Sequence, residues 1–376
     1  MLDKKMKIFV TGTRGIPDIP GGVEKHCQEL YPLIAVKGNE VVLSTRTPYV
    51  GEQKKAWKGV RLVHNYAPHK KSLEAIVHTF LAVLKAKRMN PDVVHIHAVG
   101  PCLLVPLVRL LGLKVVVTNH GPDYDRKKWG FAAKTILRFG EYLGGKYANE
   151  VIVISTVIAD IIKKRCGRNT HLIYNGVSIP KRSQQTEFLE KYGIKPGKYF
   201  LAVARFVPEK GLHDLLAAFR NIAGEWQLVI AGDADHESDY SRTLKKKAAE
   251  DDRIILTGYI TGELLSQVFS HARLFVLPSY HEGLPIVLLE AMSFGLPVLV
   301  SDIPANREVN LPAERFFQCG SVQDLRKKLK LHIEKELTKQ ERQILCRMIK
   351  EKYNWQKIAE QTIAVYRQAI TVSKNN

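Results

Sequence analysis

The sequence predicts an α/β fold in which two domains, each with a parallel β-sheet, face each other across a central cleft. Short apolar segments alternate along the chain with segments of helical period, which indicates parallel strands joined by helices. The alternation occurs twice, and a polar, turn-rich stretch near residues 175–198 separates the two occurrences. The 376 residues suffice for two domains of ordinary size.

The first domain is predicted to span residues 1–178. An apolar strand at 7–11 runs into the loop TGTRGIPDIPGG, whose glycines and prolines exclude regular structure, and a helix follows at 23–36. Further strands are predicted at 41–44, 60–63, 93–96, 115–118 and 151–154, and an amphipathic helix at about 72–87.

The second domain is predicted to span residues 179–357. The sequence from residue 323 onward is helical in period, and the helix at 358–376 is a candidate to pack back onto the first domain. The predicted strands of this domain are 199–204, 227–231, 254–257, 275–277 and 297–300.

Charge and composition limit the classes of function. The formal charge of +20 favours an anionic partner, whether nucleic acid, anionic lipid or a phosphorylated substrate. No run of apolar residues is long enough for a membrane span, and the N-terminus lacks a secretory signal, so we expect a cytoplasmic protein. The five cysteines form no CxxC pair, which argues against a disulfide framework and a zinc ribbon.

The stretch at 275–299 carries the clearest chemistry. A buried strand ends in a polar loop, and a helix begins at once with Pro285 predicted as its first residue. Glu282 precedes this helix and Glu290 lies inside it, so both can face a phosphate held by the free N–H groups of the helix N-terminus. The alternative is an ordinary βα unit with two solvated glutamates.

A second motif, VARFVPEKGL, places two cations at the end of another buried strand. Arg205 follows the strand and Lys210 lies just before Gly211, so both cations can converge on one point and neutralise a diphosphate. The alternative is a solvated basic loop.

Together, RFVPEKG and HEGLPIVLLE closely resemble the donor-site signature of the family 4 retaining glycosyltransferases, which have the GT-B fold of two Rossmann-like domains. In the first domain, TRGIPDIPGGVEKHCQEL resembles the family's glycine loop and first helix, and DVVHIH and NHG resemble its later strand ends. The resemblance therefore covers nearly the whole chain. The segment GPDYDRKKWG departs from many relatives and resembles the branch that contains bacterial rhamnosyltransferases.

The resemblance implies roles for the residues of both motifs. Arg205 and Lys210 would hold the donor diphosphate, on which negative charge grows as the glycosyl bond breaks. Glu282 would contact hydroxyls of the transferred sugar, and Glu290 would bind the ribose of the nucleotide. The predicted catalytic residues are Glu282, His120, Arg205 and Lys210, with a structural strand-end histidine as the alternative for His120.

Further residues are predicted to line the donor site. Gly21 and Gly22 would let backbone N–H groups approach a donor phosphate or the acceptor, unless they form an ordinary turn. Tyr259 follows a strand and could lie beside the nucleobase, with surface packing as the open alternative. The amides of Gly283 and Leu284, together with Ile286, complete the predicted donor set.

No metal and no other cofactor is predicted. Asp233 and Asp235 form a DxD string, which binds a metal–diphosphate complex in another glycosyltransferase class, but two cations already supply positive charge here. His95 and His97 alternate on a strand without a cysteine or acidic partner at metal-site spacing. Strand-end packing or contact with the acceptor is therefore expected for these histidines.

The segment DRKKWGFAAKTILRFGEYLGGKY combines cations with aromatic residues, as helices that rest on anionic lipid do. In the alternative arrangement, the aromatic residues face the core and the lysines face water. We predict peripheral contact with the inner face of the cell membrane, where a lipid-linked acceptor would be available. The predicted acceptor and membrane residues are Lys127, Lys128, Trp129, Lys134 and Arg138.

The predicted function is transfer of a sugar from a nucleotide-diphosphate sugar to a glycan or lipid-linked acceptor in bacterial surface-polysaccharide or lipopolysaccharide biosynthesis. Retention and the pathway are implied by the resemblance, and no metal is expected to be required. One alternative is a sugar-phosphate synthase or phosphorylase with a soluble acceptor. Another is a non-catalytic basic protein that binds nucleic acid, but no zinc-finger, RNA-recognition or helix-turn-helix signature supports it, so no nucleic-acid partner is expected.

Overall fold

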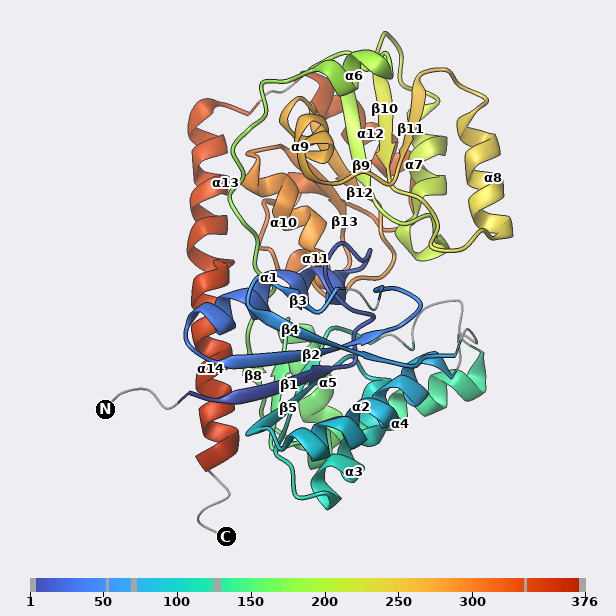
Figure 1. The fold of residues 1–376 in the computed structure, drawn as a ribbon. Helices are drawn as coiled ribbons and strands as arrows, with labels where there is room; N and C mark the ends of the chain where they lie inside the picture. Colours follow the sequence, from blue (N-terminus) through green and yellow to red (C-terminus); the bar gives the residue numbers. More distant parts are fainter. Residues whose placement is uncertain are drawn as a thin grey trace. The chain divides into compact units, whose positions relative to one another are not determined.

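The computed structural model describes residues 5–51, 54–68, 73–122, 124, 130–334 and 337–371. The chain forms two compact units (Figure 1). Unit 1 consists of Met1–Gly176 together with Trp355–Asn376, and unit 2 consists of Val177–Asn354. The chain therefore passes from unit 1 to unit 2 and back again, a few residues from the predicted boundaries at 178 and 357.

Unit 1 contains an eight-stranded sheet in the order β3-β4-β2-β1-β5-β6-β7-β8. All neighbouring strands are parallel except β3, which pairs antiparallel with β4 at one edge. The three central strands are buried along their length except at Lys7, the first residue of β1, as expected for a parallel sheet covered on both faces. The strands are β1 (Lys7–Thr11), β2 (Glu40–Arg46), β3 (Ala56–Trp57), β4 (Val60–Asn65), β5 (Val93–His97), β6 (Val115–Asn119), β7 (Glu150–Val153) and β8 (His171–Leu172).

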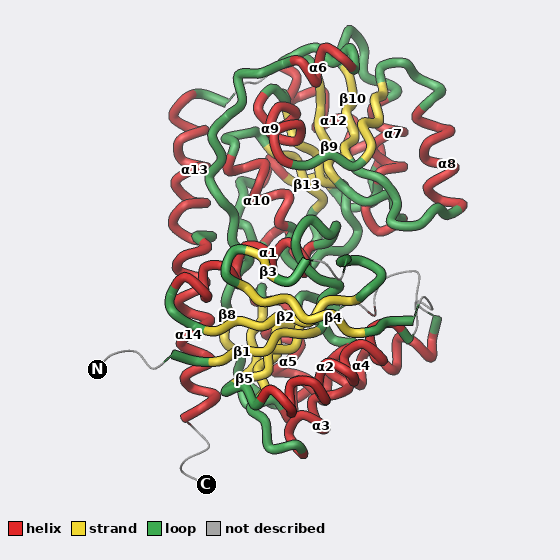
Figure 2. The backbone as a smooth tube through the Cα atoms, in the orientation of Figure 1, coloured by secondary structure: helices red, strands yellow, loops and turns green. Residues whose placement is uncertain are grey.

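Helices cover both faces of this sheet (Figure 2). On one face, α1 packs against α14, and both contribute to a core with Ile8, Val10 and Val116 of the sheet. On the other face, α2, α3 and α4 pack around the short 3₁₀ helix η1 (Pro101–Leu104). The helices are α1 (Gly22–Val36), α2 (Glu74–Met89), α3 (Val105–Leu110), α4 (Phe131–Tyr147), α5 (Thr156–Cys166) and α14 (Trp355–Thr371).

Unit 2 contains a six-stranded, fully parallel sheet in the order β11-β10-β9-β12-β13-β14. The strands are β9 (Tyr199–Val203), β10 (Gln227–Ala231), β11 (Ile254–Gly258), β12 (Leu274–Leu277), β13 (Val298–Ser301) and β14 (Phe316–Phe317).

Two groups of helices pack in unit 2. The helices α7, α8 and α12 contribute to one buried core, while α13 packs on α10 and α6 on α9. These helices are α6 (Glu187–Lys191), α7 (Leu212–Phe219), α8 (Asp239–Ala248), α9 (Gly262–Ser270), α10 (Ile286–Ser293), α11 (Pro304–Arg307), α12 (Val322–Glu334) and α13 (Lys339–Lys352), with the 3₁₀ helices η3 (Pro208–Lys210) and η4 (Ala313–Arg315).

The structure corrects the sequence prediction in two places. The polar, turn-rich stretch between the two predicted domains contains helix α6, which was not predicted, and Phe188 and Leu189 give this helix a buried apolar side. Strand β3 was not predicted, since two residues are too few to show a period of their own. All five cysteines are free thiols, as expected.

Candidate functional site

In unit 2, the two predicted donor motifs follow neighbouring strands. Strand β9 lies between β10 and β12, so the strand order runs outward from β9 in opposite directions on its two sides. The carboxyl ends of strands at such a switch point are where parallel sheets bind ligands. Arg205 follows β9 and Glu282 follows β12, so both motifs lie at this edge of the sheet.

Backbone contacts hold the two motif loops against each other. The amide of Tyr280 donates a hydrogen bond to the carbonyl of Glu209, with 2.9 Å between nitrogen and oxygen. Gly211 has a φ of +63°, and a Cβ added to it would lie 2.0 Å from the carbonyl oxygen of Pro278. Only glycine fits this conformation and this close approach. The position of Lys210 is thereby fixed relative to the loop that carries Glu282.

Lys210 and Glu282 form an ion pair at the centre of this site. Lys210 Nζ lies 2.6 Å from Glu282 Oε1, and the side chains are only 18% and 10% exposed. The hydroxyl of Ser279 donates a second hydrogen bond to Glu282 Oε1, at 2.7 Å. Burial raises the pKa of the Glu282 carboxyl, but Lys210 and Ser279 lower it by more, so the pKa lies below the ordinary 4.5. Glu282 is therefore ionised at neutral pH.

Lys210→Met tests this ion pair through the pH dependence of stability. A carboxyl with a lowered pKa stabilises the fold above its unfolded-state pKa and loses that contribution as the pH falls through its folded-state pKa. We therefore expect the difference in unfolding free energy between wild type and Lys210→Met to be full at pH 7 and to shrink below pH 4.5. Urea unfolding over a pH series measures it. Lys195→Met, which breaks the exposed pair with Glu225, is the control, and a pH-independent difference for Lys210→Met would contradict the assignment.

Arg205 contacts a different carboxylate from Lys210. Its guanidinium lies 2.6 Å from Asp235 Oδ2, and Asp233 of the same DxD string contacts Lys245 at 2.8 Å. The two predicted cations thus do not share one partner in the structure, because the 232–235 loop brings Asp235 to Arg205. The amide of Phe206 donates to the carbonyl of Asp233 at 3.1 Å and holds that loop in place.

The remaining predicted donor residues lie around the start of helix α10 and after strand β11. The prediction that Pro285 is its first residue is wrong: Pro285 is the extended N-cap residue, and the helix begins at Ile286. Leu284 and Ile286 are buried, so Leu284 has only its backbone to offer a ligand, and Glu290 lies half-buried on the helix. Tyr259 is 53% exposed after β11, the outermost strand of the sheet.

In unit 1, the predicted glycine loop is held by an ion pair. Glu24 of α1 contacts Arg14 Nε at 3.2 Å and also accepts a hydrogen bond from the Arg14 amide at 3.1 Å. Gly21 precedes α1 with a φ of +147°, and a Cβ added to it would lie 2.1 Å from Glu24 Oε2. A Cβ added to Gly22 would meet nothing within 4 Å. The two glycines therefore have different structural requirements.

Alanine variants of these glycines separate folding from contact with substrate. Gly21→Ala is expected to lower the free energy of unfolding by about 1–3 kcal/mol, because its Cβ collides with Glu24 and its φ becomes strained. Gly22→Ala is expected to keep wild-type stability, because its Cβ would meet nothing within 4 Å, and to lower turnover, because a donor phosphate or the acceptor is predicted to approach this backbone. Denaturant unfolding and steady-state kinetics measure the two effects. Equal losses of stability in both variants would contradict this distinction.

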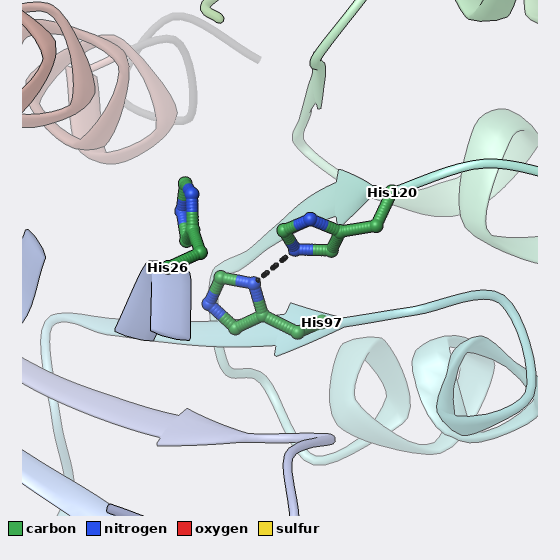
Figure 3. A group of neighbouring side chains, drawn as sticks. All are labelled: His26, His97 and His120. Carbon is green, nitrogen blue, oxygen red and sulfur yellow. Dashed lines mark hydrogen bonds between the residues drawn. The ribbon is translucent and has the colours of Figure 1, made fainter. Parts of the chain in front are cut away.

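Three histidines from distant parts of the sequence meet in unit 1 (Figure 3). His26 lies on α1, His97 ends β5, and His120 follows β6. One ring nitrogen from each lies within 4.8 Å of the others, and His97 Nδ1 is 2.9 Å from His120 Nε2. The partners of His97 in this group are histidines, whereas the prediction from the sequence concerned only cysteine and acidic partners. Neighbouring strand ends relate His97 to His120, but sequence reasoning missed His26, which no spacing connects to them.

Hydrogen bonds continue from these histidines into the core of unit 1. The hydroxyl of Tyr31 lies 2.5 Å from His97 Nε2 and 2.9 Å from His95 Nδ1. His95 Nδ1 also lies 2.6 Å from the hydroxyl of Tyr366 on α14. Burial lowers the pKa of His95 to about 3, so its ring is neutral at neutral pH. His95 has the packing role that was one of its two predicted roles.

Helix α4 exposes its large apolar side chains instead of burying them. Phe131, Phe139 and Ile136 are 89%, 55% and 49% exposed. Lys134 is half-buried and Arg138 is exposed on the same helix, so aromatic residues and cations share a solvent-facing surface. Within the described residues, no helix combines the length and apolar character needed to cross a bilayer. Lys127, Lys128 and Trp129 lie outside the described residues.

Both units match known family profiles. Residues 20–180 match the profile Glycosyltransferase Family 4, and residues 184–355 match the profile Glycosyl transferases group 1. Two Rossmann-like domains with parallel sheets define the GT-B class of fold. The chain belongs to the family 4 glycosyltransferases, which confirms the resemblance seen in its motifs.

Individual proteins show the same relationship. A Bacillus subtilis glycosyltransferase assigned to teichuronic acid biosynthesis is 26% identical over 63% of this chain, which spans 58% of that protein's length. The lipopolysaccharide 1,6-galactosyltransferase of Salmonella typhimurium is 26% identical over 66% of this chain and 67% of its own length.

Solved structures confirm the GT-B fold. The sucrose-phosphate synthase of Thermosynechococcus elongatus has a TM-score of 0.84 at 20% identity, covering 98% of this chain and 100% of that one. The Anabaena protein HepE in complex with UDP-glucose has a TM-score of 0.78 at 18% identity, covering 96% of this chain and 99% of that one.

Proposed function

We propose that the protein transfers a sugar, with retention of anomeric configuration and without a metal, from a nucleotide-diphosphate sugar to a glycan or lipid-linked acceptor. The observation that carries the proposal is the Lys210–Glu282 pair at the switch point of unit 2, within the region that matches the group 1 profile. The UDP-glucose complex of HepE supports the donor class. The relatives named for teichuronic acid biosynthesis and lipopolysaccharide support bacterial surface-polysaccharide or lipopolysaccharide biosynthesis as the pathway.

The two cations of unit 2 act on the donor diphosphate. Arg205 and Lys210 each contact a carboxylate at 2.6 Å, so both already lie in hydrogen-bonded, partly buried positions. A diphosphate offers oxygens of higher charge to the same groups. As the glycosyl bond breaks, charge grows on the leaving diphosphate, and fixed cations with the amides of Gly283 and Leu284 stabilise it most in the transition state. This arrangement supplies the positive charge that a metal would otherwise provide.

The carboxylates of unit 2 act on the sugar and the ribose. Glu282 is ionised and held by Lys210 and Ser279, so it can accept hydrogen bonds from sugar hydroxyls and favour an oxocarbenium-like transition state. Glu290 binds the ribose hydroxyls, and Tyr259 borders the nucleobase. Retention follows when the leaving phosphate itself helps to deprotonate the acceptor on the same face.

Unit 1 supplies the acceptor side. Gly21 and Gly22 offer backbone N–H groups to a phosphate or to the acceptor, and His120 contacts the transferred sugar. The exposed apolar and cationic side chains of α4 rest on anionic lipid at the inner face of the membrane, where each cation contributes about 1 kcal/mol. A cytoplasmic, peripherally attached enzyme can thereby reach a lipid-linked acceptor.

Titration with UDP, GDP, ADP, dTDP and their sugars, followed by thermal shift and calorimetry with and without EDTA and magnesium, tests the donor site. We expect one nucleotide to raise the apparent melting temperature. This increase should be the same with and without EDTA, and it should be lost in Arg205→Ala. Arg242→Ala, which removes an exposed arginine paired with Asp239, is the control. Stabilisation by no nucleotide would contradict the donor site, and dependence on magnesium would contradict metal independence.

Acceptor assays then test the second half of the proposal. We expect turnover of the stabilising nucleotide sugar with lipid-linked sugar acceptors. Turnover with a soluble sugar phosphate and none with lipid-linked sugars would select the synthase or phosphorylase alternative.

A further inference from the structure

The histidines at the carboxyl edge of the unit 1 sheet have the spacing of metal ligands. One ring nitrogen from each histidine lies within 4.8 Å of the other two, so all three nitrogens lie within about 2.8 Å of a common point. For comparison, a zinc ion lies about 2.0–2.1 Å from the nitrogen of an imidazole ligand. The ring centroids of His26, His97 and His120 are 5.0, 5.2 and 5.6 Å apart. Three imidazoles around one tetrahedral ion have centroids about 5 Å apart. Shifts of these atoms by about 1 Å, together with rotation of the rings to aim their lone pairs at the ion, would therefore complete such a site.

Hydrogen bonds outside the cluster prepare two of these rings as ligands. His26 Nδ1 lies 2.9 Å from Asn175 Oδ1, a pure acceptor, so His26 donates from Nδ1 and keeps a lone pair on Nε2. His97 Nε2 lies 2.5 Å from the hydroxyl of Tyr31, which can accept from it and leave a lone pair on Nδ1. Metal-binding histidines typically donate their second ring nitrogen in this way.

We propose that His26, His97 and His120 bind one divalent transition-metal ion of the zinc class. Three imidazole ligands leave a fourth position for water, and the half-buried His120 marks the side that solvent reaches. Nitrogen ligands without a carboxylate select zinc, cobalt, nickel or copper over magnesium and calcium. The ion takes the place of the His97–His120 hydrogen bond, and the displaced proton moves to a ring nitrogen that faces away from the ion.

This site shares His120 with the proposed sugar transfer, so a bound ion would compete with the sugar for that ring. The charge on the donor diphosphate is still neutralised by the cations of unit 2, and binding of an ion is measured independently of transfer. The competing explanation is a hydrogen-bonded polar cluster without an ion, in which the His97–His120 contact is only a hydrogen bond. Binding of cobalt distinguishes the two, because tetrahedral Co²⁺ coordinated by imidazole absorbs visible light and its spectrum reports the ligands directly.

The test is a Co²⁺ titration of the full chain after removal of metals with EDTA. We expect visible absorption of tetrahedral cobalt that saturates at one equivalent, is abolished by one equivalent of Zn²⁺, and persists in excess Mg²⁺. His26→Gln and His97→Gln are expected to weaken cobalt binding at least tenfold. His64→Gln, which alters a histidine of the same unit bonded to Thr45, is the matched control and should bind as wild type does.

Two further measurements keep the result decisive. Circular dichroism and nucleotide titration of unit 2 check that each variant is folded, and His120→Gln, at the half-buried ligand, replaces any variant that is not. Absence of the tetrahedral spectrum in the wild-type protein would overturn the proposal. So would equal binding by the ligand variants and the His64 control, which would show adventitious surface binding.

Discussion

Glu282→Gln is expected to lower turnover by about 10²- to 10³-fold, the usual effect of removing one preorganised electrostatic group. The amide keeps the shape of the side chain but loses the negative charge that we propose acts on the sugar. It also leaves Lys210, only 18% exposed, without its counter-charge. Initial rates with the nucleotide sugar identified by titration measure the loss.

The control for Glu282→Gln is Glu225→Gln in the same unit. Glu225 also pairs with a lysine, Lys195 at 3.1 Å, but this pair is exposed and lies away from the carboxyl edge of the sheet. Its variant should retain wild-type turnover, as exposed ion pairs contribute little. Wild-type rates in Glu282→Gln would show that Glu282 has no role in catalysis, even though the chain has the GT-B fold.

Gly211→Ala is expected to lower the free energy of unfolding of unit 2 by about 2–5 kcal/mol. A Cβ at this residue would lie 2.0 Å from the carbonyl oxygen of Pro278, and its φ of +63° adds strain. Relief requires the two motif loops to separate, which would also move Lys210 away from Glu282. Turnover should therefore fall together with stability. Urea unfolding and kinetics on the same preparation measure both losses.

Gly262→Ala separates the strain of the backbone from the collision. Gly262 has nearly the same φ, +59°, but a Cβ added to it meets nothing within 4 Å. Gly262→Ala should lower the free energy of unfolding by only about 1–2 kcal/mol and leave turnover unchanged. Equal losses of stability in both variants would show that φ alone sets the requirement for glycine, and that the contact between the loops is not essential.

The strands and the donor motifs could be predicted because their signals are local. Buried parallel strands are continuous apolar runs, which made them easy to find. The strand predicted at 275–277 corresponds to β12, which begins one residue earlier, at Leu274. The motif that contains Lys210 and the one that contains Glu282 follow two such strands, and parallel sheets bind ligands at strand ends. Once the two strands were taken to be neighbours in the sheet, the proximity of the two motifs could be predicted.

The rest depended on contacts between residues far apart in the sequence. Asp235 was treated as part of a string without a role, yet the turn after β10 brings it to 2.6 Å from Arg205. Helix α1 brings His26 into one group with His97 and His120, which follow two strands of the sheet. Neither contact leaves a period or a spacing in the sequence. The start of α10 was misplaced by one residue, since proline is suited to both the N-cap and the first helical position.

The path of the chain has a consequence for the order of folding during synthesis. Unit 2 is continuous in sequence, whereas unit 1 needs α14, which packs on α1 and adds Tyr366 to its core. A ribosome that adds about 5–20 residues per second needs on the order of 10–40 s to make the intervening segment 177–354. The half of the protein that emerges first must wait, with the α14-facing side of its sheet uncovered, until the half that emerges second has been made.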